Sequence, residues 1–215
     1  MTPPADHPRF RPLEADWEYL ALDELAGLGW LPANGNELAP GSGHRKSWDD
    51  LVLYSDLHEA IERLNPELPP EAVRQAVDEA TRVRSHDAYE ENRIAHGYLT
   101  GGIRSVTYTD DFGAEHTPTI RLLDLSDPAA NTYRAARQVA VIQGERNRRF
   151  DIVLYVNGLP LGIIEIKRAG DGDATLEDAH AQIHWYLDEF PTAFRYNAVV
   201  LLSDGITAKY GTPFT

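Results

Sequence analysis

The residues best suited to chemistry are Asp151, Glu165 and Lys167, which form the pattern Asp-x13-Glu-x-Lys within the run FDIVLYVNGLPLGIIEIK. Side chains alternate between the two faces of a β-strand, so Glu165 and Lys167 would share one face while Ile164 and Ile166 occupy the other. Two carboxylates beside a lysine can hold a hard divalent cation and activate water. The pattern therefore predicts metal-dependent hydrolysis of a phosphodiester.

A Glu-x-Lys pair also arises by chance in amphipathic strands. In that alternative interpretation, Glu165 and Lys167 lie solvated on an edge strand and Asp151 caps a strand start. However, Ile163 to Ile166 have the composition of a buried central strand. Charged side chains in such a strand need a partner or a function. This context favours the catalytic interpretation.

The two acids can meet only if the strands pair in a suitable register. The apolar runs DIVLYV and LGIIEIK flank Asn157-Gly158, a strong hairpin signal. A two-residue loop would pair Val156 with Leu159 and leave the two acids on opposite faces. A three-residue loop over 157–159 would pair the two acids on one face. We therefore expect the odd-length loop, or a β-bulge with the same effect.

Segments along nearly the whole chain match one known family. They are RRFDIVLYVNGLPLGIIEIK, AHAQIHWY and FRYNAVVLLSDGITAKYGT, preceded by LEADWEYLALDELAGLGW, AIERLNPELPPEA and IRLLDLSDPAANTYRAARQVAV. In these segments the chain resembles the N-terminal nuclease domain of the restriction (R) subunit of type I restriction enzymes. The resemblance implies an α/β restriction-endonuclease-like PD-(D/E)XK fold, in which a mixed central β-sheet is flanked by α-helices, with a helical N-terminal part.

The resemblance also implies roles for individual residues. Asp151 and Glu165 would bind the metal, and Lys167 would complete the catalytic set. Gln182 and Tyr186 match the Q-x-x-x-Y motif that such enzymes carry on the following helix. From spacing alone, these two residues are equally consistent with a border tyrosine beside an exposed glutamine.

Two further positions matter to this comparison. Glu18 matches an acidic position on the family's first helix, although Glu14 lies one turn away and is the alternative. Phe150 stands where the family motif usually has proline. That proline shapes the entry to the strand and takes no part in the chemistry, so Phe150 bears on local geometry more than on activity.

Composition limits the class of protein. With 215 residues, of which 42% are hydrophobic, the chain can bury a substantial core. It has no apolar stretch near the ~20 residues of a membrane span and no signal-peptide pattern. The absence of cysteine excludes disulfides and thiolate metal sites. We expect a cytoplasmic protein without a membrane partner.

The net charge and the local charge give opposite indications about nucleic-acid binding. A formal net charge of −14 argues against a free-standing DNA-binding protein, because phosphates are bound through Lys and Arg. Locally, residues 134–149 contain five arginines and one acid. We expect Arg146, Arg148, Arg149 and Arg168 to form a basic lip beside the acidic site and to contact DNA. The alternative is a solvated loop.

The remaining sequence predicts the order of elements. The first 12 residues are rich in proline and are expected to be flexible, and residues 13–215 are expected to form a single domain. Helical spacing predicts three helices before any strand. Their ranges are 17–28, 54–64 and 70–83. Strands are expected at 106–108, 120–125 and 138–142 before the hairpin, and a helix at 176–190 with a strand at 198–202 after it.

Taken with the resemblance, these features predict a Mg²⁺-dependent endonuclease domain, with Mn²⁺ as a substitute metal. It would hydrolyse foreign double-stranded DNA within a complex that contains modification and specificity subunits. The resemblance implies a fragment of a longer R subunit, whose ATP-dependent translocase domains are absent from this chain. ATP would therefore act only through those domains, in agreement with the lack of a G-x-x-x-x-G-K-[ST] motif here.

Two other functions are consistent with the sequence. One is a docking or regulatory module with a degenerate nuclease site, which would use the helices of residues 50–64 and 70–83 against other subunits. The other is a stand-alone DNA-repair nuclease of the same fold, which would cut without partners or ATP. The intact Asp-Glu-Lys set argues against the docking module.

Overall fold

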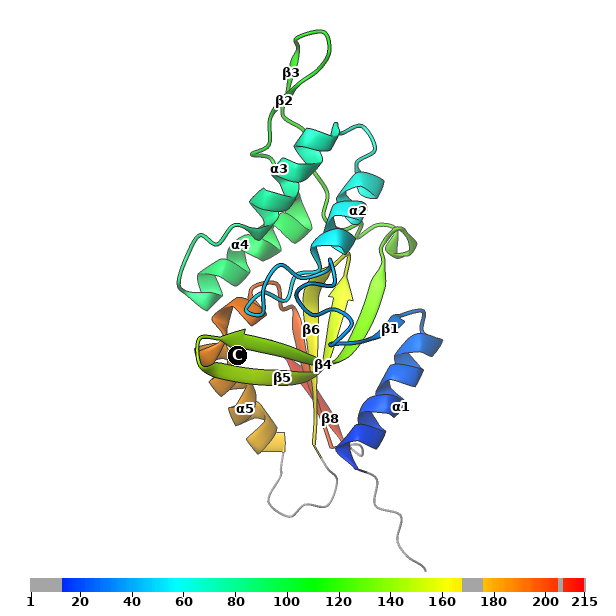
Figure 1. Cartoon of the computed structure of the whole chain (residues 1–215), viewed down its shortest axis with the longest axis vertical. Helices are drawn as coiled ribbons and strands as arrows, with labels where there is room; N and C mark the ends of the chain where they lie inside the picture. The colour runs from blue at the N-terminus through cyan, green and yellow to red at the C-terminus, as the bar shows by residue number, and fades with distance from the viewer. Residues whose placement is uncertain (1–12, 168–175, 205–206, 215) are drawn as a thin grey trace, which may run out of the picture.

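A computed structural model describes residues 13–167, 176–204 and 207–214 (Figure 1). The flexibility expected of residues 1–12 concerns a segment outside this range. The described elements are α1 (Glu14–Gly27), β1 (Leu31–Asn34), α2 (Tyr54–Leu64), α3 (Pro70–Thr81), α4 (Ala88–Gly101), β2 (Tyr108–Thr109), β3 (Glu115–His116), η1 (Pro128–Ala130), β4 (Tyr133–Gln143), β5 (Arg146–Val156), β6 (Leu159–Ile166), α5 (Leu176–Glu189), η2 (Pro191–Phe194), β7 (Val199–Ser203) and β8 (Ala208–Gly211).

A mixed sheet forms the centre of the described chain. Its strand order is β1-β4-β5-β6-β7-β8. The β1–β4 and β6–β7 pairs are parallel, whereas β4–β5, β5–β6 and β7–β8 are antiparallel. The predicted mixed sheet, and the parallel crossover from β6 through α5 to β7, are therefore confirmed.

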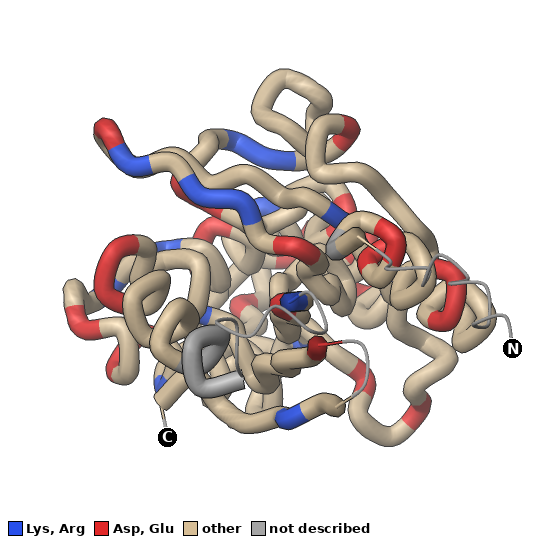
Figure 2. Tube along the Cα trace, turned by 90° about the horizontal axis from the view of Figure 1, so that it is seen from below, with Lys and Arg blue, Asp and Glu red and all other residues tan. Residues whose placement is uncertain are grey.

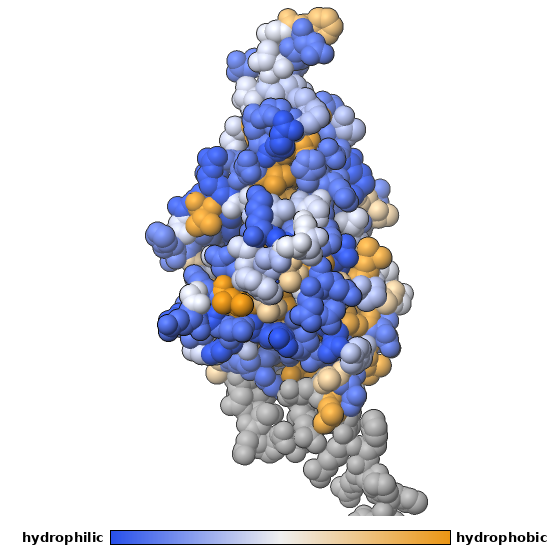
Figure 3. All heavy atoms as spheres, in the orientation of Figure 1, coloured by the Kyte–Doolittle hydropathy of each residue, from blue (hydrophilic) through white to orange (hydrophobic). Residues whose placement is uncertain are grey.

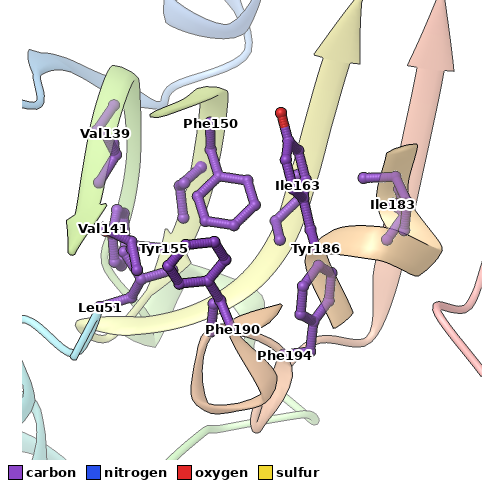
Figure 4. Packing of buried hydrophobic residues seen from close by; sticks show 14 of the residues in the cluster. Leu51, Val139, Val141, Phe150, Tyr155, Ile163, Ile183, Tyr186, Phe190 and Phe194 are labelled. Carbon is purple, nitrogen blue, oxygen red and sulfur yellow. The ribbon is translucent and has the colours of Figure 1, made fainter. Parts of the chain in front are cut away.

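Helices α1 and α5 cover opposite faces of this sheet (Figure 1). On β6, Ile164 and Ile166 pack in the cluster that contains Leu22 of α1. Ile163 packs in the cluster that contains Ile183 of α5, together with aromatic side chains from β5, α5 and η2 (Figure 4). The expected alternation along β6 is confirmed, so the face that carries Glu165 is the face covered by α5.

The helices α2, α3 and α4 pack around a separate apolar cluster. The predicted helices at α2 and α3 are confirmed. Helix α3 begins at Pro70, where the missing N–H of proline costs no hydrogen bond, because the first N–H groups of a helix have no partner within it. The expectation that three helices precede the first strand is wrong, because β1 follows α1. Helix α4 was not predicted, because its sequence AYEENRIAHGYLTG mixes polar residues and glycines.

The region after α4 has less strand than predicted. Residues 120–125 do not form a strand, and only Ile120 pairs, through a single bridge to Ile103. A short hairpin of β2 and β3 projects from the helices, and its outer end carries a hydrophobic group beside hydrophilic ones (Figures 1 and 3). Phe112 lies between its strands and is 96% exposed.

The β5–β6 hairpin corrects one prediction and confirms its alternative. The loop has two residues, since Val156 pairs with Leu159, so the three-residue loop is wrong. Both Asn157 and Gly158 have positive φ, as a type I′ turn requires. The register then shifts next to Leu161: Tyr155 pairs with Pro160, whereas Leu154 pairs with Gly162. This β-bulge has the effect that the longer loop would have had.

None of the described helices combines the length and the apolar character that a bilayer span requires.

Candidate active site

The bulge brings the two predicted acids to facing positions. Beyond the shift, Ile152 pairs with Ile164, so the next positions outward are Asp151 and Glu165. The backbone N–H of Ile166 donates a hydrogen bond to Asp151 Oδ2 over 2.8 Å. Asp151 is thus fixed on the neighbouring strand beside Glu165, although thirteen residues separate the two in sequence.

Glu165 is the centre of a set of polar contacts on the α5 side of the sheet. The residue is 2% exposed. Lys167 Nζ donates to Glu165 Oε1 over 2.9 Å, and Gln182 Nε2 donates to the same oxygen over 2.7 Å. Gln182 Nε2 also donates to the hydroxyl oxygen of Tyr186. The backbone of Lys167 is held by its N–H, which donates to the carbonyl of Ser203 on β7.

Glu18 approaches the site from the opposite side, on α1. It is 4% exposed and forms an ion pair of 3.2 Å with Arg137 of β4. Gln138 Nε2 donates to Glu18 Oε1 over 2.9 Å and lies 3.5 Å from Asp151 Oδ1. Glu18 therefore reaches the acid pair through Gln138. The side chain of Glu14, the alternative, lies outside the described part of the chain.

The electrostatics of the site are those of a crowded acid pair. Burial and, after it, the charge of Glu165 raise the pKa of Asp151, the hydrogen bond from Ile166 opposes the rise, and the net pKa is about 7. Burial and the same Glu165 charge raise the pKa of the Tyr186 hydroxyl. Tyr186 is therefore a neutral hydrogen-bonding group near neutral pH, while the acids favour any positive charge that can be placed between them.

A divalent cation fits this donor set. Mg²⁺ takes oxygen ligands and commonly uses one or two carboxylates together with water and substrate phosphates. Asp151 and Glu165 supply two such carboxylates from adjacent strands. In the described residues, no group of three or more His, Asp or Glu side chains is arranged to hold a metal ion. The candidate protein ligands are therefore this pair, with Glu18 linked to it through Gln138.

Phe150, at the position of the motif proline, is a core residue. It is fully buried, and its ring meets those of Tyr186 and Phe194 edge to face, at centroid distances of 5.4 and 6.1 Å. These aromatic side chains are labelled in Figure 4. Phe150, which directly precedes Asp151 in the chain, thus packs against the ring of Tyr186.

Three of the four predicted DNA-contacting arginines lie on the projecting end of the β4–β5 hairpin. We call Arg146, Arg148 and Arg149 the arginine arm. Arg149 is exposed. Arg146 and Arg148 form ion pairs with Glu189 of α5, at 3.7 and 3.6 Å, without hydrogen bonds of good geometry. The fourth residue, Arg168, lies outside the described range.

The arm also meets an aromatic side chain. The guanidinium of Arg148 lies 4.0 Å from the ring centroid of Trp185. Trp185 and Glu189 are three and seven residues after Gln182 and therefore follow the same side of α5. The five arginines of residues 134–149 do not form one patch, because Arg134 pairs with Asp56 and Arg137 with Glu18.

Sequence reasoning did not find every residue around the acids and the arginine arm. Trp185 and Glu189 could have been found from their helical spacing to Gln182. Gln138 could not, because no local pattern distinguishes it from the other polar residues of β4. The structure brings together Asp151, Glu165, Lys167, Gln182, Tyr186 and Glu18, as the prediction requires.

Comparison with known proteins gives the family. The family model described as type I restriction enzyme R protein N terminus matches residues 11–215. The type I restriction enzyme HindI endonuclease subunit of Haemophilus influenzae is 34% identical over 93% of this chain and 19% of its own length. A protein of Methanocaldococcus jannaschii, provisionally named a type I restriction enzyme endonuclease subunit, is 28% identical over 91% of this chain and 19% of its own length.

The chain therefore spans about a fifth of the length of these curated relatives. The family match, in contrast, covers almost all of the chain. The recognition made from the sequence is confirmed: the chain belongs to the family of N-terminal regions of type I restriction enzyme R proteins.

Proposed function

We propose that residues 13–215 form a single domain of the PD-(D/E)XK fold that acts as a Mg²⁺-dependent endonuclease on double-stranded DNA. The observation that carries the proposal is the meeting of Asp151, in the middle of β5, with Glu165 and Lys167 at the end of β6, where Gln182 is hydrogen-bonded to Glu165. The names of the relatives, which are endonuclease subunits, point to the same reaction.

Asp151 and Glu165 would hold the cation. When bound, a divalent cation polarises a phosphate oxygen and lowers the pKa of a water molecule. Gln182 keeps the Glu165 carboxylate in one orientation, and the Ile166 N–H does the same for Asp151. Orientation of this kind is a large part of the advantage of a preformed site.

Lys167 would face the negative charge that develops on the phosphate in the transition state. Its ammonium lies beside Glu165 and can also donate to a phosphate oxygen or to the attacking water. In the hydrolysis, the water oxygen bonds to phosphorus, the phosphorus–oxygen ester bond breaks, and the departing oxygen gains the proton that the water loses. Lys167 would orient the water and balance the negative charge of the transition state.

DNA would reach the site along the arginine arm. Arg146, Arg148 and Arg149 carry charge that suits phosphate, and we assign Arg168 the same role from its sequence position. Along α5, seven residues separate Gln182 from Glu189, which corresponds to about 10 Å, or roughly three nucleotides of one strand. The arm would therefore contact phosphates roughly three nucleotides from the one that is cut.

The proposal also includes the complex in which the domain would act. The domain would act in a type I restriction complex with modification and specificity subunits in the cytoplasm, on foreign DNA. ATP-driven translocation would come from parts of the longer protein that this chain does not contain. The lengths of the relatives, about five times that of the matched region, support this arrangement.

The test is plasmid cleavage by this chain with Mg²⁺ or Mn²⁺. We expect cutting that Asp151→Ala and Lys167→Ala abolish, while Asp188→Ala, an exposed aspartate on α5, leaves it unchanged. If the chain alone does not cut, the same variants are compared in the complete restriction complex. Unchanged restriction by Lys167→Ala there, with normal assembly, would contradict the proposal.

The same experiment separates the two other functions. A docking module with a degenerate site predicts that Lys167→Ala changes nothing and that substitutions on the exposed sides of α2 and α3 impair assembly. A stand-alone repair nuclease also predicts cutting by the chain without any other subunit and without ATP, but it predicts that Lys167→Ala leaves restriction by the complete complex unchanged. Loss of cleavage with retained assembly is the outcome that only the restriction endonuclease predicts.

A further inference from the structure

Gln138 has a backbone conformation that is unusual for its place. It lies in the middle of β4, yet its φ is 56°, in the left-handed region that side chains other than glycine seldom adopt. On either side, Arg137 pairs with Ile152 and Val139 pairs with Phe150, so Gln138 lies opposite Asp151. The residue with the unusual backbone and the candidate catalytic acid therefore face each other on neighbouring strands.

The conformation changes which side chains face α5. Ala136, before Gln138, and Val139, after it, belong to the same apolar cluster, although regular alternation would separate them. On β5, Phe150 and Val153 likewise share that cluster on the two sides of Asp151. In both strands, therefore, the regular alternation of side chains between the two faces is interrupted next to Asp151.

The side chain of Gln138 uses this position. Its amide donates to Glu18 Oε1 over 2.9 Å and lies 3.5 Å from Asp151 Oδ1. Arg137, the preceding residue, holds the other oxygen of Glu18 at 3.2 Å. Glu18 is thus fixed by two consecutive residues of β4, and one of them also reaches Asp151.

A glycine far away in sequence holds the backbone. The N–H of Gly35, directly after β1, donates to the carbonyl of Arg137 over 2.7 Å. A Cβ at Gly35 would lie 2.3 Å from the carbonyl oxygen of Gln138 and 2.7 Å from the Cα of Val139. Only glycine permits this approach, so the end of β1 packs directly on the backbone of β4 at Gln138 and Val139.

We infer that Gln138 is a positioning residue of the candidate active site, whose amide links Glu18 of α1 to Asp151 of β5. The inference rests on the proposed function and goes beyond it, because it connects a third acid to the metal-binding pair through a neutral group. A strained backbone at a site persists where the surroundings impose it. Here Gly35, Arg137 and the opposing strand do so.

The test compares Gln138→Gly with Gln143→Gly in this chain. The first substitution keeps a residue that readily adopts positive φ and removes the amide, and the second makes the same change at the exposed end of β4. Mn²⁺ affinity is measured by titration calorimetry, and the melting temperature is measured without metal. We expect Gln138→Gly to weaken Mn²⁺ binding about tenfold, as loss of an outer partner of a metal ligand does.

A purely structural role would give a different result. It predicts a lower melting temperature for Gln138→Gly than for Gln143→Gly and the same Mn²⁺ affinity, and that result would overturn the inference. Weaker Mn²⁺ binding by Gln138→Gly, with a melting temperature close to that of the Gln143→Gly control, supports it.

A measurement without metal keeps the inference separate from the proposed function. Absence of Mn²⁺ binding by the wild-type chain counts against the proposed metal site. The link itself is then judged from the unfolding free energies of Glu18→Gln, Asp151→Asn and the double variant. We expect their effects to be non-additive in the wild-type background and closer to additive with Gln138→Gly, where the direct interaction of the two carboxyl charges remains. Additivity in both backgrounds would overturn the inference.

Discussion

At the scale of single residues, the main feature is an acid that is held where its charge is unfavourable. Asp151 is mostly buried and faces Glu165, while Lys167 supplies a nearby positive charge. Its pKa of about 7 lies above the ordinary value of 3.8, so the folded chain binds a proton that the unfolded chain has released at intermediate pH. The folded state is therefore destabilised by this group as pH rises from about 4 to about 7.

This argument predicts the effect of removing the charge. In metal-free buffer at pH 8, Asp151→Asn should raise the free energy of unfolding, by on the order of 2 kcal/mol, because the variant no longer buries a charged carboxylate and no longer places a second charge beside Glu165. At pH 4, where the wild-type carboxyl is protonated in the folded state, the two proteins should be about equally stable. Urea unfolding at the two pH values measures the difference.

The control for that prediction is Asp188→Asn, which removes the same charge from an exposed position of α5. It should change stability little at either pH. A wild-type chain that is as stable as Asp151→Asn at pH 8 would show that the site tolerates both charges without a cation.

Sequence alone located these acids but not everything that orients them. Asp151, Glu165 and Lys167 follow from strand alternation and a hairpin signal, both of which are local. Gln138 does not, since its left-handed backbone depends on contact with Gly35, about a hundred residues earlier. No periodicity within β4 carries that information.

At the scale of elements, the β5–β6 hairpin shows how a local prediction can be right about the outcome and wrong about the means. The requirement that both acids share a face is met by the shift next to Leu161. The loop stays at two residues because Asn157 and Gly158 fit a tight turn that packs on Leu53. The Leu53 N–H donates to the Gly158 carbonyl, and a Cβ at Gly158 would lie 2.4 Å from the Leu53 oxygen.

The contact between the β1 end and β4 predicts a strong effect of a small substitution. Gly35→Ala places a methyl group against backbone atoms of Gln138 and Val139 that cannot rotate away. We expect a loss of about 1–3 kcal/mol in unfolding free energy, the usual range for overpacking. Gly27→Ala, at the end of α1 where an added Cβ has no neighbour within 4 Å, is the matched control. It should be neutral or slightly stabilising. Equal effects of the two substitutions would contradict the argument.

The pairing of the arginine arm with α5 predicts an effect on DNA binding. Glu189 neutralises Arg146 and Arg148 at distances of 3.6 to 3.7 Å, so it competes with phosphate for both. Glu189→Gln should therefore tighten binding of a short duplex by roughly three- to tenfold at low salt, which is on the order of 1 kcal/mol. Fluorescence anisotropy of a labelled duplex measures it.

Asp188→Asn separates this local effect from the change in net charge. It alters the charge of the chain equally at the neighbouring position of α5, away from the described ion pairs of the arm. It should tighten binding less than Glu189→Gln does. Weaker binding by Glu189→Gln would mean that Glu189 positions the arginines for DNA, and the competition argument would be wrong.

At the scale of the whole molecule, the net charge of the chain works against DNA binding. The net charge is −14, and acidic residues lie on several sides of the molecule (Figure 2). Long-range repulsion from this charge opposes the attraction of the arginine arm to DNA. The fold could be predicted from the sequence as far as sheet type and the α5 crossover. Short β1 and the polar helix α4 could not, because tertiary packing rather than local pattern stabilises them.

The balance between the arm and the remaining charge can be measured through salt. If the three arginines of the arm contact phosphates, a plot of the logarithm of the DNA association constant against that of the salt concentration should have a slope of about −3. Arg149→Ala should weaken binding and change this slope by about one, because one phosphate contact is lost. Arg74→Ala, which removes an exposed arginine on α3, should leave the slope unchanged. If both variants change the slope equally, DNA binding does not depend on the arm in particular, and the path of DNA must be sought on another surface.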